Sequence, residues 1–155
     1  PLLINMDAQA PNVVAQEWLE QKILFPDLRY LKPECKYGDS RFDFYGETTR
    51  KNFFFFLKGV TLEQDGVVLF PDAPTERGVK HLHELTRCLK DGYAAYVLFV
   101  VQLAQAAYFT PNDTTHPAFG EALRQAKQAG VHVLAYTCSV TPATLSIATP
   151  LPVKL

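Results

Sequence analysis

The chain has 155 residues, of which 48% are hydrophobic and 20% are charged, and its formal net charge is −1. This length and composition are typical of one ordinary globular domain and exclude a disordered chain. Because the net charge is close to zero, any contact with nucleic acid would need a local group of cations. The longest wholly apolar run, residues 93–101, is too short to cross a bilayer as a helix, so we expect no membrane association.

The three cysteines, Cys35, Cys88 and Cys138, are odd in number and widely spaced. This pattern predicts free thiols and a cytoplasmic protein rather than a disulfide framework. The sequence shows no charged segment followed by an apolar stretch of the kind that directs secretion. It begins with Pro1 instead of methionine, so we expect a processed product or a shortened piece of a longer protein.

The first part of the chain predicts one helix and several hairpin-linked strands. Apolar residues recur at helical spacing over residues 12–23, with Asn12 as the N-cap. Asp65-Gly66 is a strong signal for a hairpin turn. The strand-like segments that follow the helix are residues 30–37, 41–45, 53–62 and 67–70.

The second part alternates helices with strands. Leucines at helical spacing predict a helix that starts after Pro74 and stops near Asp91-Gly92. The apolar residues 93–102 predict a central strand that is covered on both faces. A short strand, a helix ended by Gly130, another strand, and an edge strand or tail follow at residues 106–109, 117–129, 131–140 and 151–155. This order predicts an α/β fold, with a mixed β-sheet flanked by helices.

Two of the predicted strands carry a charge among large apolar residues, with turn-prone residues 46–49 between them. Alternation places Phe42 and Phe44 on one face of the first strand and Asp43 on the other, while Lys58 follows five apolar residues. A hairpin would bring the carboxylate and the ammonium close together, which is part of what metal-dependent phosphodiester cleavage requires. Alternatively, Asp43 pairs with Arg41 on an exposed strand face, and Lys58 extends to its strand end and pairs with Asp43.

Further polar residues leave two interpretations open. Glu34 is either a second acid of this cluster or a surface residue opposite Lys36. The second predicted helix has a polar face that is either solvated or binds phosphates. The cations for the second interpretation are Arg77, Lys80, His81 and Arg87.

Several of these segments together resemble the sugar fermentation stimulation protein A family of bacteria and archaea, over nearly the whole chain. The most specific stretch is residues 70–82, and it is supported by residues 34–38, 40–44, 58–62 and 151–155. The resemblance implies that residues 1–155 form one nuclease-like domain, related to the PD-(D/E)XK restriction-endonuclease core. The family's N-terminal OB-fold domain would then be absent from this chain. The resemblance also implies non-specific DNA binding and a regulatory link to sugar metabolism.

One position departs from the family pattern. The family usually has Glu-Val-Lys where this chain has Phe56-Leu57-Lys58, so the glutamate that would share a metal ion with Asp43 is replaced by Phe56. A hard divalent cation is usually held by one or two carboxylates together with water and substrate phosphate. The phenyl ring removes a ligand and excludes water. We therefore expect weak or absent catalysis, with Mg²⁺ or Mn²⁺ held weakly if at all.

The sequence thus leaves two functions from different classes. The first is a DNA-binding domain without catalysis, which holds phosphates through cations around Lys36, Arg41, Lys58, Arg77 and Lys80. The second is a Mg²⁺- or Mn²⁺-dependent nuclease with Asp43 and Glu34 as metal ligands and Lys58 assisting attack. A sugar-binding function has no support, because the single tryptophan, Trp18, belongs to the apolar stripe of a predicted helix.

Overall fold

The computed structural model describes residues 10–140 and 145–155. Over these residues the helices are α1 (Ala10–Glu20), α2 (Glu76–Lys90) and α3 (Pro117–Ala129). The strands of the main sheet are β1 (Leu28–Tyr37), β2 (Ser40–Thr48), β3 (Asn52–Val60), β6 (Ala94–Val101), β8 (His132–Val140) and β9 (Leu145–Pro150). A smaller sheet contains β4 (Leu62–Gln64), β5 (Val67–Phe70) and β7 (Tyr108–Pro111).

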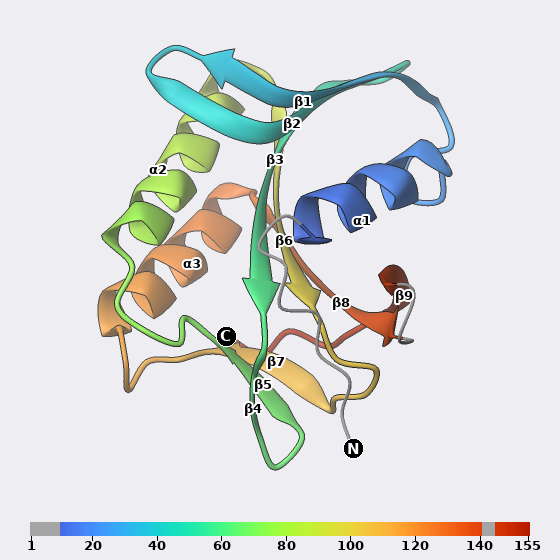
Figure 1. The fold of residues 1–155 in the computed structure, drawn as a ribbon. Coiled ribbons are helices and arrows are strands. Elements are labelled where there is room, and N and C mark those ends of the chain that lie inside the picture. The colour runs from blue at the N-terminus through green and yellow to red at the C-terminus, as the bar shows by residue number, and fades with distance from the viewer. Residues whose placement is uncertain (1–9, 141–144) are drawn as a thin grey trace.

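The main sheet is mixed, with the strand order β1-β2-β3-β6-β8-β9 (Figure 1). The strands β1, β2 and β3 pair as antiparallel neighbours, β3, β6 and β8 are parallel, and β9 is antiparallel to β8. The central strand β6 is almost wholly buried, as expected for a parallel strand that is covered on both faces. The predicted α/β class, with a mixed sheet flanked by helices, is confirmed.

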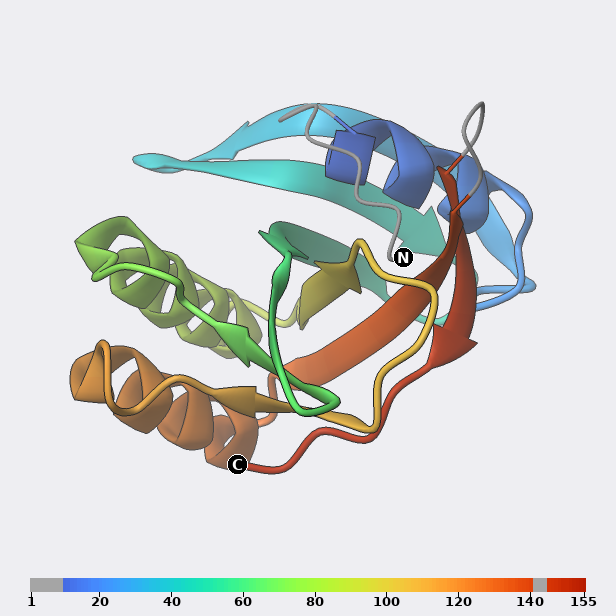
Figure 2. The ribbon, with the colours of Figure 1, turned by 60° about the horizontal axis from the view of Figure 1, so that its bottom comes forward.

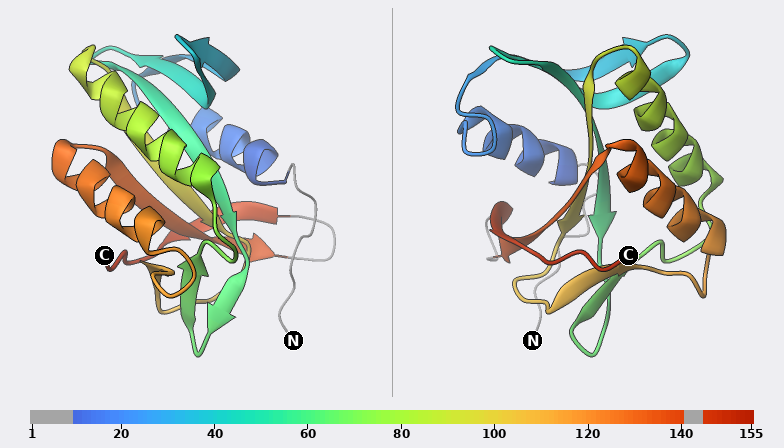
Figure 3. Two further views of the ribbon diagram at one scale, coloured as in Figure 1. Left: turned by 90° about the vertical axis from the view of Figure 1, so that its left-hand side faces the viewer. Right: turned by 180° about the vertical axis from the view of Figure 1, so that it is seen from behind.

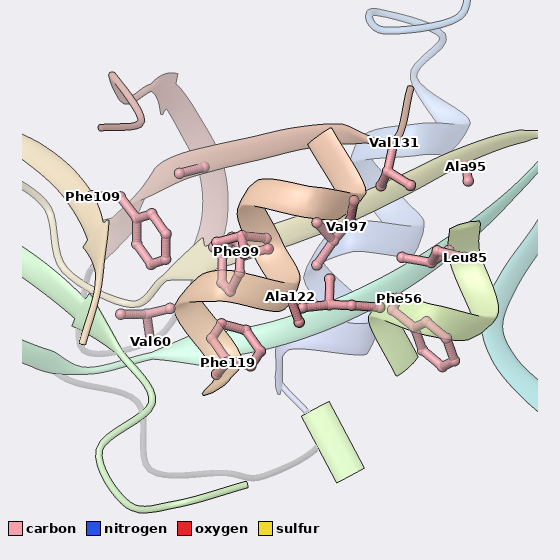
Figure 4. Close-up of a cluster of buried hydrophobic side chains, with 14 of the residues drawn as sticks. Phe56, Val60, Leu85, Ala95, Val97, Phe99, Phe109, Phe119, Ala122 and Val131 are labelled. Atoms are coloured by element: carbon pink, nitrogen blue, oxygen red, sulfur yellow. The ribbon is translucent and has the colours of Figure 1, made fainter. Parts of the chain in front are cut away.

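Helices cover both faces of this sheet. Figure 2 shows α2 and α3 side by side, and Figure 3 shows them on one face with α1 on the other. Successive β3 side chains point to opposite faces, so Phe54 and Phe56 join the core cluster under α2 and α3, while Phe53 and Phe55 join the cluster under α1. Figure 4 shows part of the first cluster, to which β3, α2 and α3 contribute Phe56, Leu85 and Phe119.

The ends of α2 and α3 follow from local sequence. The hydroxyl of Thr75 accepts a hydrogen bond from the backbone N–H of Gly78 at 3.0 Å and so caps the start of α2. The helix α3 ends at Gly130, whose φ of 118° lies in the left-handed region that favours glycine. The predicted C-cap at Gly130 is therefore confirmed.

Three expectations about the elements need correction. Residues 46–49 do not form the turn as a unit, because Gly46 lies inside β2, buried under the ring of Phe53. The strand expected over residues 53–62 is divided at Thr61 into β3 and β4. Asn12 lies inside α1 rather than at its N-cap. Of the two alternatives for residues 151–155, the tail is the correct one, with a single bridge from Val153 to Phe109.

The three cysteines are free, which agrees with the prediction from their spacing. Among the described residues, no helix is both long and apolar enough to cross a membrane.

Candidate functional site

Asp43 lies where β2 stops pairing with β3. The pairing extends from Glu47↔Asn52 to Phe44↔Phe55, so Asp43 is the next residue beyond it. Phe42 and Phe44 were expected to share one face, but Phe42 packs into the cluster under α2 and α3 and Phe44 into the cluster under α1. The regular alternation of β2 is therefore interrupted at Asp43.

The side chain of Asp43 replaces part of the missing pairing. Its Oδ2 accepts a hydrogen bond from the backbone N–H of Leu57 at 2.7 Å, and its Oδ1 accepts one from the Asn12 side-chain amide at 3.3 Å. Burial raises the pKa of this carboxyl, although the two hydrogen bonds and the nearby charges of Lys58 and Arg77 act in the opposite direction. Both carboxylate oxygens thus already have protein partners.

Lys58 and Asp43 share a neighbourhood but form no ion pair. Among the described residues, the ion pairs join Arg124 to Asp113 and to Glu121. Asp43 therefore forms an ion pair with neither Arg41 nor Lys58. The two ion pairs that the sequence suggested for Asp43 are both wrong. The hairpin between β2 and β3 does bring Asp43 close enough for its charge to raise the pKa of Lys58.

The partner of Lys58 is His81, from α2. The ammonium Nζ lies 2.7 Å from His81 Nδ1 and 5.7 Å from the centroid of the Phe56 ring. Burial lowers the pKa of Lys58 to about 8. Burial, followed by the charge of Lys58, lowers the pKa of His81 to about 3, so His81 is neutral at pH 7. A neutral imidazole has one acceptor nitrogen, and both of its nitrogens face a donor here, because Arg77 Nε lies 3.5 Å from Nε2. The shorter contact, with Lys58, assigns the acceptor role to Nδ1.

Phe56 fills the space beside this pair. Its side chain is 1% exposed, and its ring stacks on His81 with a centroid distance of 3.8 Å and an interplanar angle of 13°. On its other side it packs against Phe42 at 4.7 Å. The position at which the family resemblance implies a glutamate is therefore a dry aromatic layer.

The predicted DNA-binding cations gather at one groove. Arg41, Arg77 and Lys80 line a groove of about 620 Å³ between the start of β2 and α2. Lys36 is the cross-strand neighbour of Arg41 in the β1–β2 pair, and both are exposed. The groove also contains acidic residues, which are Asp39, Glu76 and Glu84.

The β1–β2 hairpin is fixed to α2 beside this groove. The hydroxyl of Ser40 donates to the carboxylate of Glu84, which is 5% exposed, and the hydroxyl of Tyr37 donates to Asp91 at the end of α2. Figure 1 shows the closed end of the hairpin over α2. These two contacts hold Arg41 opposite Arg77 and Lys80.

The predicted metal ligands do not make a complete site. Glu34 is exposed, has a φ of 53°, and lies across from Asp43 between the pairs Pro33↔Phe44 and Cys35↔Phe42. No group of three or more His, Cys, Asp or Glu side chains that could hold a metal ion occurs among the described residues. Because Phe56 supplies no ligand beside Asp43 and Glu34 is exposed, the residues present do not complete a Mg²⁺ or Mn²⁺ site.

Sequence reasoning missed or misread several residues of this site. His81 was counted among the phosphate-binding cations, whereas here it is a neutral acceptor for Lys58. The contact of Asn12 with Asp43 had no local signal, because it depends on how α1 packs against the sheet. Gln102, which the sequence offers either as a polar group of a site or as a strand-terminal residue, lies directly after β6 and is 5% exposed. Its Oε1 lacks a hydrogen-bond partner in the described part of the chain.

Comparison with known proteins gives consistent matches. A family model described as "Sugar fermentation stimulation protein RE domain" matches residues 9–144. A sugar fermentation stimulation protein homolog of Clostridium beijerinckii is 52% identical over 145 residues, which are 94% of this chain and 64% of that protein. A homolog of Desulfitobacterium hafniense (strain Y51) is 53% identical over 153 residues, which are 99% of this chain and 67% of that protein.

A solved structure is also similar. The Pyrococcus furiosus SfsA structure, described as a complex with Ca²⁺, superposes with a TM-score of 0.79 at 26% identity and covers 92% of this chain. This chain covers 61% of that protein. It thus spans roughly two thirds of the length of the relatives that it matches.

Proposed function

Because the chain belongs to the sugar fermentation stimulation protein family, we propose that it is a DNA-binding domain that holds duplex DNA by its phosphates, without reading the base sequence. The observation that carries this proposal is the groove in which Arg41, Arg77 and Lys80 converge from β2 and α2. Lys36 extends the same row of cations along the β1–β2 hairpin.

Local charge explains how a chain with a net charge of −1 can bind a polyanion. Phosphate contacts by lysine and arginine release counterions from DNA and need no particular base sequence. The acids Asp39, Glu76 and Glu84 in the same groove limit the local positive potential. We therefore infer binding that is moderate in strength and highly sensitive to salt.

The scaffold of this domain is, in our proposal, a PD-(D/E)XK nuclease-like core. Its support is the carboxylate of Asp43 and the ammonium of Lys58 on neighbouring strands of a mixed sheet. Phe56, which is buried and stacked on His81 where a second carboxylate would be needed, favours a domain that holds DNA but does not cut it. A cytoplasmic location and a regulatory link to sugar metabolism belong to the same proposal.

A second candidate is a Mg²⁺- or Mn²⁺-dependent nuclease that uses Asp43, Glu34 and Lys58. One observation favours it, namely that the Pyrococcus furiosus relative is described in complex with Ca²⁺. The dry contact between Phe56 and His81 speaks against it in this chain.

Fluorescence anisotropy with two duplexes of equal length and unrelated sequence tests the proposed DNA binding. With four phosphate contacts, we expect log K to fall against log salt with a slope of about −3.6 for both duplexes. The triple variant Arg41→Ala/Arg77→Ala/Lys80→Ala should lower the affinity by at least about tenfold and flatten the slope to about −1.

A matched control removes three exposed cations that do not line the groove, Lys32→Ala/Lys127→Ala/Lys154→Ala. It should retain most of the affinity. Binding that is indifferent to salt, that is confined to one duplex, or that falls equally in both triple variants would refute the proposal.

A further inference from the structure

A second hollow lies at the end of the sheet opposite to Lys58. It has a volume of about 570 Å³ and is lined by the loop after α1, by the turn between β2 and β3, and by the first residues of β6 and β8. Because β3 and β6 are parallel, Phe53 pairs with Ala94 at this end and Lys58 pairs with Phe99 toward the other. The hollow is thus separate from the groove, and its volume is in the usual range for small-molecule pockets.

Aromatic rings line one side of this pocket, namely Phe25, Phe53, Tyr96 and His132, and Phe55 supports Tyr96 from the core. Phe55, Tyr96 and His132, from β3, β6 and β8, make a column with centroid distances of 4.6 Å and 4.6 Å and interplanar angles of 10° and 20°. His132 ends the column and is exposed. Phe25 stacks on Phe53 at 4.3 Å. A planar ligand ring that entered the pocket would pack against the exposed ring of His132.

The rim of the pocket favours an anion. Arg50 and Lys51 lie in the turn between β2 and β3, are exposed, and line the pocket. The acid in the lining is Asp27, whose Oδ2 already accepts hydrogen bonds from the hydroxyl of Thr49 at 2.6 Å and from its backbone N–H at 3.2 Å. The hydrogen bonds from Thr49 and, to a smaller extent, the charge of Arg50 lower the pKa of this carboxyl. Neither Arg50 nor Lys51 takes part in an ion pair among the described residues.

The aromatic side chains of this pocket can pack against a planar ring, and the two cations beside them can bind a phosphate attached to that ring. We propose that this pocket binds a free mononucleotide, with its base stacked on His132 and its phosphate held by Arg50 and Lys51. The proposal uses residues outside the DNA-binding groove and does not depend on the proposed function.

Isothermal titration of the native chain with AMP, adenosine and inorganic phosphate tests this site. We expect one AMP per chain, adenosine binding at least about tenfold weaker, and no measurable binding of phosphate alone. Arg50→Ala/Lys51→Ala should weaken AMP by at least about tenfold and leave adenosine unchanged. His132→Ala should weaken both, because both carry the base.

The control Lys32→Ala/Lys154→Ala removes two exposed cations from other surfaces and should bind AMP as the native chain does. Circular dichroism establishes that each variant is folded. The proposal is wrong if the native chain does not bind AMP, or if AMP binding survives both the Arg50/Lys51 and the His132 variants. It is equally wrong if AMP binding is lost in Arg77→Ala/Lys80→Ala, which would place the nucleotide in the groove.

Discussion

The ring of Phe56 lies between those of Phe42 and His81, on the face of β3 that also carries Lys58. A carboxylate at this position would be buried, and a buried charge is costly unless it is paired. Lys58 is the nearby cation that could pair with such a carboxylate, but its ammonium contacts His81 instead. With phenylalanine at position 56, Lys58 contacts the neutral imidazole of His81, whereas a glutamate there would offer Lys58 a carboxylate.

Phe56→Glu tests whether the site is a disabled nuclease. We expect the native chain not to nick supercoiled plasmid with Mg²⁺ or Mn²⁺, and the variant to gain Mn²⁺-dependent nicking. Losing the buried ring should also lower the free energy of unfolding by about 3 kcal/mol. Phe56→Gln introduces a side chain that has the shape of glutamate but no charge, so it should lose stability without gaining nuclease activity. Nicking by the native chain that disappears in Asp43→Ala would instead support the second candidate function.

His81 predicts a pH dependence of stability. Burial and the charge of Lys58 lower its pKa from 6.5 to about 3 in the folded chain, so the unfolded chain binds a proton more readily. Stability from this group is complete above about pH 6.5 and is lost as the pH falls toward 3. His81→Phe keeps a ring on Phe56 and removes the titration, so its melting temperature should fall less between these pH values. An unchanged pH profile in His81→Phe, or an equal change in the exposed His83→Phe, would contradict this explanation.

At the scale of elements, the β1–β2 hairpin depends on α2 for its position. Ser40 and Tyr37 are the residues that attach it, and only the first contact is buried, through Glu84. Removing a single partner from a buried polar pair is expensive because the other group stays desolvated. Arg41 follows Ser40 directly, so this contact also sets where one of the groove cations lies.

Ser40→Ala should therefore lower the free energy of unfolding by about 2 kcal/mol, measured by urea denaturation, and should also weaken DNA binding. The double variant Ser40→Ala/Glu84→Leu removes both polar groups and should recover most of the stability. A double variant as unstable as the sum of the two single changes would show that the two groups do not act as a pair.

At the scale of the whole molecule, the sequence predicted those helices and strands whose apolar residues follow a regular local pattern. The apolar run of β6 and the leucines of α2 identified both elements, and Gly130 marked the end of α3. Contacts between distant segments were not predictable in this way. Gly46 looked like a turn residue, but it is a glycine because a Cβ there would lie 2.1 Å from the Phe53 ring.

The candidate site shows the same division between local pattern and long-range contact. Composition and spacing brought out Asp43, Lys58 and the cations of the groove. The pairing of Lys58 with His81, and of Asp43 with Asn12, depends on how α2 and α1 dock on opposite faces of the sheet. No local pattern in the sequence carries that information.

The parallel pairing of β3, β6 and β8 also has a consequence for how the chain is made. The strands β1, β2 and β3 can pair soon after synthesis, because they are consecutive antiparallel neighbours. The other edge of β3, with its four phenylalanines, has no partner until β6 has been made, and β6 in turn waits for β8. The four phenylalanines of β3 are thus made well before the strand that covers their free edge, which exposes the nascent chain to aggregation.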